Sequence, residues 1–293
     1  MKNEIMYNYN IKDDISVIKM NDKYRFSYKD EIYMLEPLKI KIEELYEIVN
    51  LNFENNKFYK IIGNKEKKPI TQIMGNNYVL LKKEIKNTTN IEIDLYTSSK
   101  VPQEKYNLDR SDWYKLWSTK IDYFEYQLNH LEEKYQLISE SIDYFIGMTE
   151  SAISYVNETF SLEKKDKNDS ICICHKRISD NNFYHPFNIV FDYKARDISE
   201  YLKYIFYSNK YSDEKLETII KKSKLSRFQM RLVYGRMYYP SYYFDKYEKI
   251  INDKINEKDL LTIINRIEEY EQYLIKIYLL INKIYDIPKI SWI

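Results

Sequence analysis

Glycine, cysteine and proline are all scarce in this chain, which has four Gly, two Cys and six Pro among 293 residues. Two cysteines are too few for the disulfide framework of a small secreted domain. A bridge between Cys172 and Cys174, two apart on an extended strand, would be strained. We therefore expect a reducing compartment. No Pro-rich or Gly/Ser-rich linker divides the sequence, and no repeat of fixed period is found.

Net charge and long apolar runs are lacking as well. The 46 Lys and Arg nearly balance the 45 Asp and Glu, so no overall field would attract nucleic acid or an anionic membrane. Residues 1–14 contain no apolar core of signal-peptide length, and the most apolar late run, Tyr273–Ile281, is interrupted by Lys276. The sequence thus predicts neither export by a signal peptide nor a membrane-spanning helix.

Tyrosine, by contrast, is abundant, with 32 residues. An AT-rich genome favours tyrosine codons and would explain this number. Oxidative cross-linking in an insoluble assembly is the other explanation, and the sequence does not separate the two.

The first 84 residues are predicted to form a small β-sheet lobe with one helix. Between Ile15 and Leu38, short runs of β-forming residues are separated by the polar pairs Asn21-Asp22 and Lys29-Asp30, a pattern typical of a meander. Apolar residues then recur at helical spacing over Ile40–Leu51. Strand-like runs return at residues 58–62, 70–74 and 78–81.

Residues 85–293 are predicted to form a larger, mainly helical lobe. One long helix is expected over residues 111–139, because apolar residues recur there in steps of four and three. We call this row the apolar seam: Trp117, Ile121, Phe124, Leu128, Leu131, Tyr135 and Ile138. Such a seam either packs inside the core or joins two copies into a homo-oligomer. Further helices are expected at 142–160, 198–206, 213–222, 227–238 and 258–284.

The segment Cys172–Tyr207 resembles the active-site segment of aminoglycoside and choline phosphotransferases. Those kinases carry His-x-Asp-x-x-x-x-Asn, then a metal-binding Asp after a short apolar run, then a structural Asp that opens a helix. The matching positions here are His175, Arg177, Asn182, Asp192 and Asp197. The resemblance therefore puts Arg177 in place of the catalytic Asp. An arginine cannot accept a proton at any relevant pH.

Four motifs, in order, extend the resemblance from Ile15 to about Tyr238: YMLEPLK, NYVLLKKE, ICHKRI and FDYKARDISEYLKY. Together they resemble the bacterial spore coat kinase-like proteins, the CotS-like group, and most of all its YutH branch. The resemblance implies an α+β, protein-kinase-like fold of two lobes. It also implies location in the endospore coat, with other coat proteins as partners.

Several residues retain competing interpretations. Asn182 and Asp192, ten residues apart, could meet on one magnesium ion, or could serve only as turn and cap residues. The resemblance gives His175 and Asp197 structural roles, Asp197 as an N-cap or as a buried hydrogen-bond anchor. Arg177 is expected either to form a salt bridge, with Asp192 or Asp180, or to be solvated.

The phosphate-binding lysine of the family is replaced by Glu36 in the YMLEPLK motif. Lys39 or Lys41 could instead reach the phosphates from the following helix. The Asn21-Asp22 turn contains no glycine that would let the backbone approach a phosphate.

The same segment allows two other interpretations. A second register, over His185-Pro186-Phe187-Asn188, also lacks the catalytic base. Cys172, Cys174 and His175 are too few for a closed zinc site, which needs four ligands, and fit a buried strand better.

The sequence supports three hypotheses. The first is a catalytically impaired kinase-fold protein, a pseudokinase, that needs no cofactor and serves as a structural or interaction component of the coat. The second is an atypical phosphotransferase that acts on a small molecule or a coat protein and uses Mg and ATP. Its base would be Asp180 or another carboxylate, with Asp192 and Asn182 on magnesium. The third is a helical scaffold unrelated to kinases.

Overall fold

A computed structural model of the protein describes residues 1–51, 58–83, 91, 95–96, 101, 106–128 and 134–291. The chain divides into two compact units. Unit 1 comprises Met1–Asp94, Gln103–Leu108 and Ser179–Val190, and unit 2 comprises Leu95–Pro102, Asp109–Ile178 and Phe191–Ile293. The boundary predicted between residues 84 and 85 lies outside the described residues and stays a prediction.

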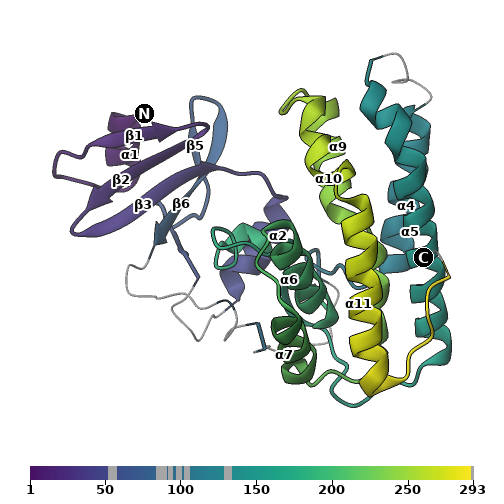
Figure 1. The fold of residues 1–293 in the computed structure, drawn as a ribbon. Coiled ribbons are helices and arrows are strands. Elements are labelled where there is room, and N and C mark those ends of the chain that lie inside the picture. Colours follow the sequence, from purple (N-terminus) through teal and green to yellow (C-terminus); the bar gives the residue numbers. More distant parts are fainter. Residues whose placement is uncertain are drawn as a thin grey trace. The chain divides into compact units, whose positions relative to one another are not determined.

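Unit 1 is built on an antiparallel sheet of six strands (Figure 1). The strands are β1 Val17–Met20, β2 Lys23–Tyr28, β3 Glu31–Pro37, β4 Lys60–Ile62, β5 Thr71–Ile73 and β6 Asn76–Lys83. Their order is β1-β2-β3-β6-β4, and β5 pairs with the beginning of β6. The meander predicted over Ile15–Leu38 is confirmed by β1, β2 and β3.

Helices pack on the two faces of this sheet. The predicted helix is confirmed as α2, Ile42–Asn50, whose Leu45 is buried against Val79 and Leu81. Helix α1, Lys2–Asn8, was not predicted, because only one of its seven residues, Ile5, is buried and gives no periodic signal. Ile5 packs with Leu80 on the opposite face, as the alternation of side chains along β6 requires.

Unit 2 is mainly helical, as predicted. Its helices are α4 Trp113–Leu128, α5 Gln136–Leu162, α6 Ala195–Tyr207, α7 Asp213–Ser223, α8 Arg227–Tyr238, α9 Ser241–Ile251, α10 Leu261–Ile264 and α11 Ile267–Tyr285. Unit 2 also contains strand β7, Cys172–His175, and the short 3-10 helix η2, Glu257–Leu260. Strand β8, Ile189–Asp192, pairs with β7 and spans the unit boundary at Val190, and the 3-10 helix η1, Pro186–Asn188, belongs to unit 1. Helix α8 is buried along nearly its whole length and packs against α5 and α6.

The single helix predicted over residues 111–139 is wrong. Tyr135 has φ −131° and ψ 90°, outside the helical region, and precedes the first residue of α5. The apolar seam continues across this break because α4 and α5 pack side by side around one core (Figure 1). Trp117 stacks on Tyr239 and Phe124 contacts Phe244, so these seam residues are buried inside unit 2 and form no surface for a second copy.

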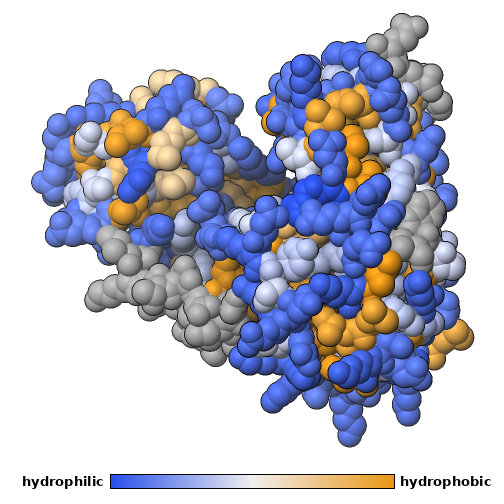
Figure 2. Space-filling view, in the orientation of Figure 1, coloured by the Kyte–Doolittle hydropathy of each residue, from blue (hydrophilic) through white to orange (hydrophobic). Residues whose placement is uncertain are grey.

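The helix predicted over residues 258–284 is also interrupted. It consists of η2, α10 and α11, with Asn265 and Arg266 between the last two. No helix within the described ranges is long and apolar enough to cross a membrane. The face of the protein drawn in Figure 2 is mostly hydrophilic, and its apolar residues form small separate groups.

Candidate functional site

Asp192, the expected metal ligand, lies at the end of β8 and is fully buried. The indole Nε1 of Trp113 donates to both carboxylate oxygens, at 3.0 and 2.8 Å. Arg196 Nη1 donates to Oδ2 at 2.8 Å, and the Tyr193 amide donates to Oδ1 at 2.7 Å. A carboxylate offers about four lone-pair sites, so these four contacts use the positions that a magnesium ion would need.

Burial raises the pKa of Asp192 above its ordinary value of 3.8, although Arg196 and Arg236 act in the opposite direction. The loss of hydration around this carboxylate therefore outweighs the attraction of the two guanidinium groups. Asp192 is held by its own chain at an energetic cost.

Arg177, which the motif resemblance sets at the position of the catalytic Asp, forms a bidentate ion pair with Asp245. Its Nε and Nη2 donate to the two carboxylate oxygens at 2.6 and 2.7 Å, and its Nη1 lies 3.6 Å from Glu200 Oε1. The predicted pairing of Arg177 with Asp192 is wrong, because the guanidinium that binds Asp192 comes from Arg196. Arg196 follows Asp192 by only four residues and is oriented by the first turn of α6.

The charge of Arg177 is strongly maintained. Burial alone would lower its pKa, but Asp245 and Glu200 raise the pKa above its usual range. The side chain therefore cannot serve as a proton acceptor.

From the partly exposed pair of Asp245 and Arg177, a series of charged residues continues into the interior of unit 2. Arg236 Nε and Nη2 donate to Glu200 Oε1 at 3.2 and 3.0 Å, and the Arg236 guanidinium lies over the ring of Trp113, 4.8 Å from its centre. Burial acts to raise the pKa of Glu200, but Arg177, Lys203 and Arg236 lower it to about 2. We call Asp245, Arg177, Glu200, Arg236, Arg196 and Asp192 the buried ion network.

Sequence reasoning missed most of this network. The pattern Arg196-x-x-x-Glu200 carried a signal, because residues four apart share one face of a helix. Nothing in the sequence pointed to Asp245 or Arg236, which come from α9 and α8.

His175 and Asp197 contact each other in the interior of unit 2. The Asp197 carboxylate accepts the His175 backbone amide at 2.8 Å and lies 3.0 Å from Nδ1 of its ring and 3.2 Å from Lys194 Nζ. His175 and Lys194 overcome the effect of burial and hold the pKa of Asp197 well below its usual range. The N-cap residue of α6 is Lys194, so Asp197 does not cap the helix and instead anchors it to β7.

Cys172 and Cys174 are both buried, with their sulfur atoms 3.6 Å apart. Cys174 Sγ donates to the backbone carbonyl of Tyr193 at 3.4 Å. Within the part of the chain that the structure describes, no three His, Cys, Asp or Glu side chains are grouped so that they could hold a metal.

Glu36, which the motif resemblance sets at the position of the phosphate-binding lysine, is buried in unit 1. Lys23 Nζ lies 2.9 Å from its Oε2, and His185 Nε2 lies 3.2 Å from the same atom. The Phe187 amide donates to His185 Nδ1 at 3.2 Å, so in this tautomer Nε2 carries the proton and donates to Glu36. Although burial opposes them, His185 and Lys23 lower the pKa of Glu36, which favours its anionic form.

Lys39, the proposed substitute for that lysine, forms an ion pair with Asp22 at 2.5 Å. Both residues belong to unit 1. The ammonium group of Lys39 is thus already engaged with a carboxylate of its own chain.

Asn182 forms hydrogen bonds within its own loop. Its Oδ1 accepts the Ser179 amide at 2.8 Å, and its carbonyl accepts Asn188 Nδ2 at 3.0 Å. These are the turn contacts that asparagine commonly makes. Asn182 belongs to unit 1 and Asp192 to unit 2.

The segment Ser179–Val190 is held on the sheet of unit 1. Phe187 packs with Leu45, Val79 and Leu81, and the Tyr59 amide donates to the Tyr184 carbonyl at 3.2 Å. Together with the His185–Glu36 contact, these interactions fix the segment by apolar packing and internal hydrogen bonds.

Comparison with solved structures shows which fold this is. An aminoglycoside phosphotransferase from Alicyclobacillus acidocaldarius matches with a TM-score of 0.62 and 11% identity, over 97% of each chain. A spectinomycin phosphotransferase, crystallised with ADP and spectinomycin, matches with a TM-score of 0.57 and 11% identity, over 97% of this chain and 98% of that one. The predicted α+β, protein-kinase-like fold is confirmed, and the helical scaffold unrelated to kinases is excluded.

Comparison of sequences shows the family. The endospore coat-associated protein YutH of Bacillus subtilis strain 168 is 28% identical over 207 residues, which cover 62% of this chain and 61% of that protein. The match therefore spans less than two thirds of the relative's length. The family model described as spore coat putative kinase YutH matches residues 2–277. This chain therefore belongs to the YutH family of spore coat putative kinases.

Proposed function

We propose that this protein is a pseudokinase that serves as a structural or interaction component of the endospore coat. The observation that carries the proposal is the Asp192 carboxylate, whose two oxygens are occupied by Trp113, Arg196 and a backbone amide. In a working kinase an Asp at this position binds magnesium.

Two further substitutions weaken phosphoryl transfer. Arg177 cannot accept a proton, and removal of a positioned acid–base group costs on the order of 100- to 10,000-fold in rate. Glu36 brings a negative charge to the position of the phosphate-binding lysine. Because phosphoryl transfer depends on positioning and charge stabilisation, these changes affect the interactions that dominate catalysis.

Location in the coat rests on the family. The Bacillus subtilis relative is named as endospore coat-associated, and we extend that location, with other coat proteins as partners, to this chain. The near balance of charge gives no reason to expect binding to nucleic acid. Homo-oligomerisation through residues 111–139 is not part of the proposal, because the described seam residues of α4 and α5 are packed inside unit 2.

A thermal melt of the full chain with Mg and ATP tests the loss of catalysis. A ligand present at about 100 times its dissociation constant stabilises the native state by roughly 2.7 kcal/mol, a shift of several degrees in Tm. We expect no shift and no ATP turnover with Mg and ATP. ATP turnover that requires magnesium and disappears in the Asp192→Asn variant would contradict the proposal. Abolition of that turnover by Asp180→Asn would then identify the base of the alternative phosphotransferase.

The structural role has its own test. In spores that carry Asp192→Asn or Glu36→Gln in place of the wild-type chain, we expect the protein to be recovered from the coat fraction in unchanged amount. Absence of the wild-type chain from that fraction would contradict the proposed location.

A further inference from the structure

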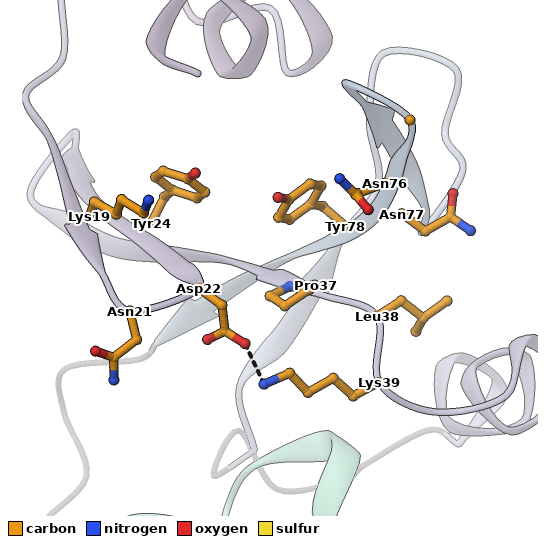
Figure 3. Close-up of a pocket in the computed structure, with 11 residues that line it drawn as sticks. Lys19, Asn21, Asp22, Tyr24, Pro37, Leu38, Lys39, Asn76, Asn77 and Tyr78 are labelled. Carbon is orange, nitrogen blue, oxygen red and sulfur yellow. Dashed lines mark ion pairs between the residues drawn. The ribbon is translucent and has the colours of Figure 1, made fainter. Parts of the chain in front are cut away.

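A hollow of about 760 Å³ lies in unit 1 at one end of the sheet (Figure 3). Its walls come from β1, β2 and β6, from the turns beside them, and from the end of β3 with the two residues that follow it. This volume lies within the range of about 300–1,000 Å³ that is usual for small-molecule sites. Tyr24 and Pro37 in its wall lie on the sheet face opposite Glu36, since side chains alternate along a strand.

The walls of the hollow are held in place by short turns. Asn21-Asp22 joins β1 to β2, and Met74-Gly75 joins β5 to β6, so each hairpin turns in two residues. Met74 and Gly75 both have positive φ, 50° and 80°, as a type I′ turn requires. The Leu38 amide donates to the Asn77 carbonyl at 2.8 Å and ties the end of β3 to the start of β6. The hollow is therefore formed before any ligand arrives.

Two tyrosine rings border the hollow. Tyr24 and Tyr78 have ring centres 6.3 Å apart and planes inclined at 62°. Two rings so inclined do not form the parallel slot that would hold a flat base between them. Each ring can instead pack against the C–H face of a saturated ring.

The polar groups of the hollow are largely unused. Among the described residues, the hydroxyls of Tyr24 and Tyr78 and the ammonium of Lys19 have no hydrogen-bond partner. Asn76 makes only a long contact of 3.4 Å to the Met74 carbonyl. Amide and hydroxyl groups both donate and accept, and so they match the hydroxyls of a ligand.

The charge of the hollow argues against a phosphate ligand. Asp22 and Lys39 neutralise each other across its lower edge in Figure 3. Lys19 then remains as an exposed cation of the hollow, whereas a phosphate is usually bound by several charged or N–H donors.

We propose that this hollow binds a neutral oligosaccharide. Sugar rings pack against Tyr24 and Tyr78, and sugar hydroxyls form hydrogen bonds with the side-chain amide of Asn76 and with the ammonium of Lys19. The site is independent of the proposed loss of kinase activity, because it uses none of the residues of the buried ion network, nor Glu36.

Ligand-observed NMR with the full chain tests the proposal. The probes are maltotriose, cellotriose and triacetylchitotriose, each at up to about 10 mM, which detects a Kd in the millimolar range. We expect at least one of them to bind. Tyr78→Ala should weaken that binding at least about tenfold, and Tyr78→Phe, which removes only the hydroxyl, should weaken it less.

Asn76→Ala is a second variant, at an exposed residue, in case Tyr78→Ala fails to fold, and it should weaken binding severalfold. Tyr46→Ala is the matched control, since Tyr46 is an exposed tyrosine of α2 outside the hollow, and it should bind like the wild type. The proposal is overturned if no trisaccharide binds, or if binding survives both Tyr78→Ala and Asn76→Ala. Binding of a proline-rich peptide in place of all three sugars would overturn it too.

Discussion

Replacement of Arg196 by methionine should destabilise unit 2 strongly and in a pH-dependent way. In the wild-type protein Arg196 Nη1 lies 2.8 Å from the fully buried Asp192 carboxylate, and Arg196 Nε donates to the His175 carbonyl at 2.8 Å. Removal of one partner of a buried ion pair commonly costs about 3–5 kcal/mol. At about 2–4 °C per kcal/mol, the expected fall in Tm at pH 7 is roughly 6–20 °C.

The pH dependence follows from the pKa of Asp192. Burial already raises this pKa above its ordinary value of 3.8, and loss of Arg196 removes an interaction that lowers it. An acid whose pKa is raised on folding binds a proton more readily in the folded state, so its ionisation costs stability as pH rises through the folded pKa. The loss caused by Arg196→Met should therefore be smaller at pH 5 than at pH 7.

The assay is chemical denaturation at the two pH values, with Lys221→Met as the control. Glu217 and Lys221 form an ion pair at the same i,i+4 spacing as Asp192 and Arg196, but on the exposed surface of α7. Loss of that pair should cost about 0.3–0.5 kcal/mol. If Arg196→Met destabilised the protein no more than Lys221→Met, the reasoning about Asp192 would be refuted.

Three other predictions concern the same unit. Arg177→Asp restores the kinase residue but places a carboxylate beside Asp245 and Glu200, so we expect a loss of about 3 kcal/mol or more in urea denaturation and no ATP turnover. Folding lowers the pKa of Glu200 from 4.5 to about 2, so ionised Glu200 stabilises the folded state above pH 4.5, and this stabilisation is lost as the pH falls toward 2. In Glu200→Gln the free energy of unfolding should therefore fall less steeply over this pH range. Gly235→Ala puts a Cβ 2.8 Å from Val156 Cγ2, and its cost of about 1–3 kcal/mol should appear as a lower denaturation midpoint.

Local patterns predicted the elements of unit 1 well. The polar pairs Asn21-Asp22 and Lys29-Asp30 marked both turns of the meander, because the strands on either side need only two connecting residues. Helix α2 was predicted because its buried positions, Leu45 and Ile48, recur at helical spacing.

Where the prediction failed in unit 2, hydrophobic spacing carried too little information. The spacing of apolar residues correctly indicated that Trp117 and Ile138 face the core. It did not indicate that the chain leaves the helical conformation at Tyr135. Helix α9 was missed although Tyr243, Phe244, Tyr247 and Ile250 are all buried at helical spacing. Tyrosine occurs both inside and on the surface of proteins, so a tyrosine-rich segment gives a weak periodic signal.

The sequence by itself determined which residue types stand at the positions that the motifs match. An arginine at position 177 cannot accept a proton at any relevant pH, and a glutamate at position 36 cannot supply a cation, so both departures from the expected motif could be read directly. Only the tertiary structure decided which partners these charges have. Asp245 lies 68 residues from Arg177 in sequence, and His185 lies 149 residues from Glu36. Contacts so distant depend on how whole elements pack, and no local pattern records that.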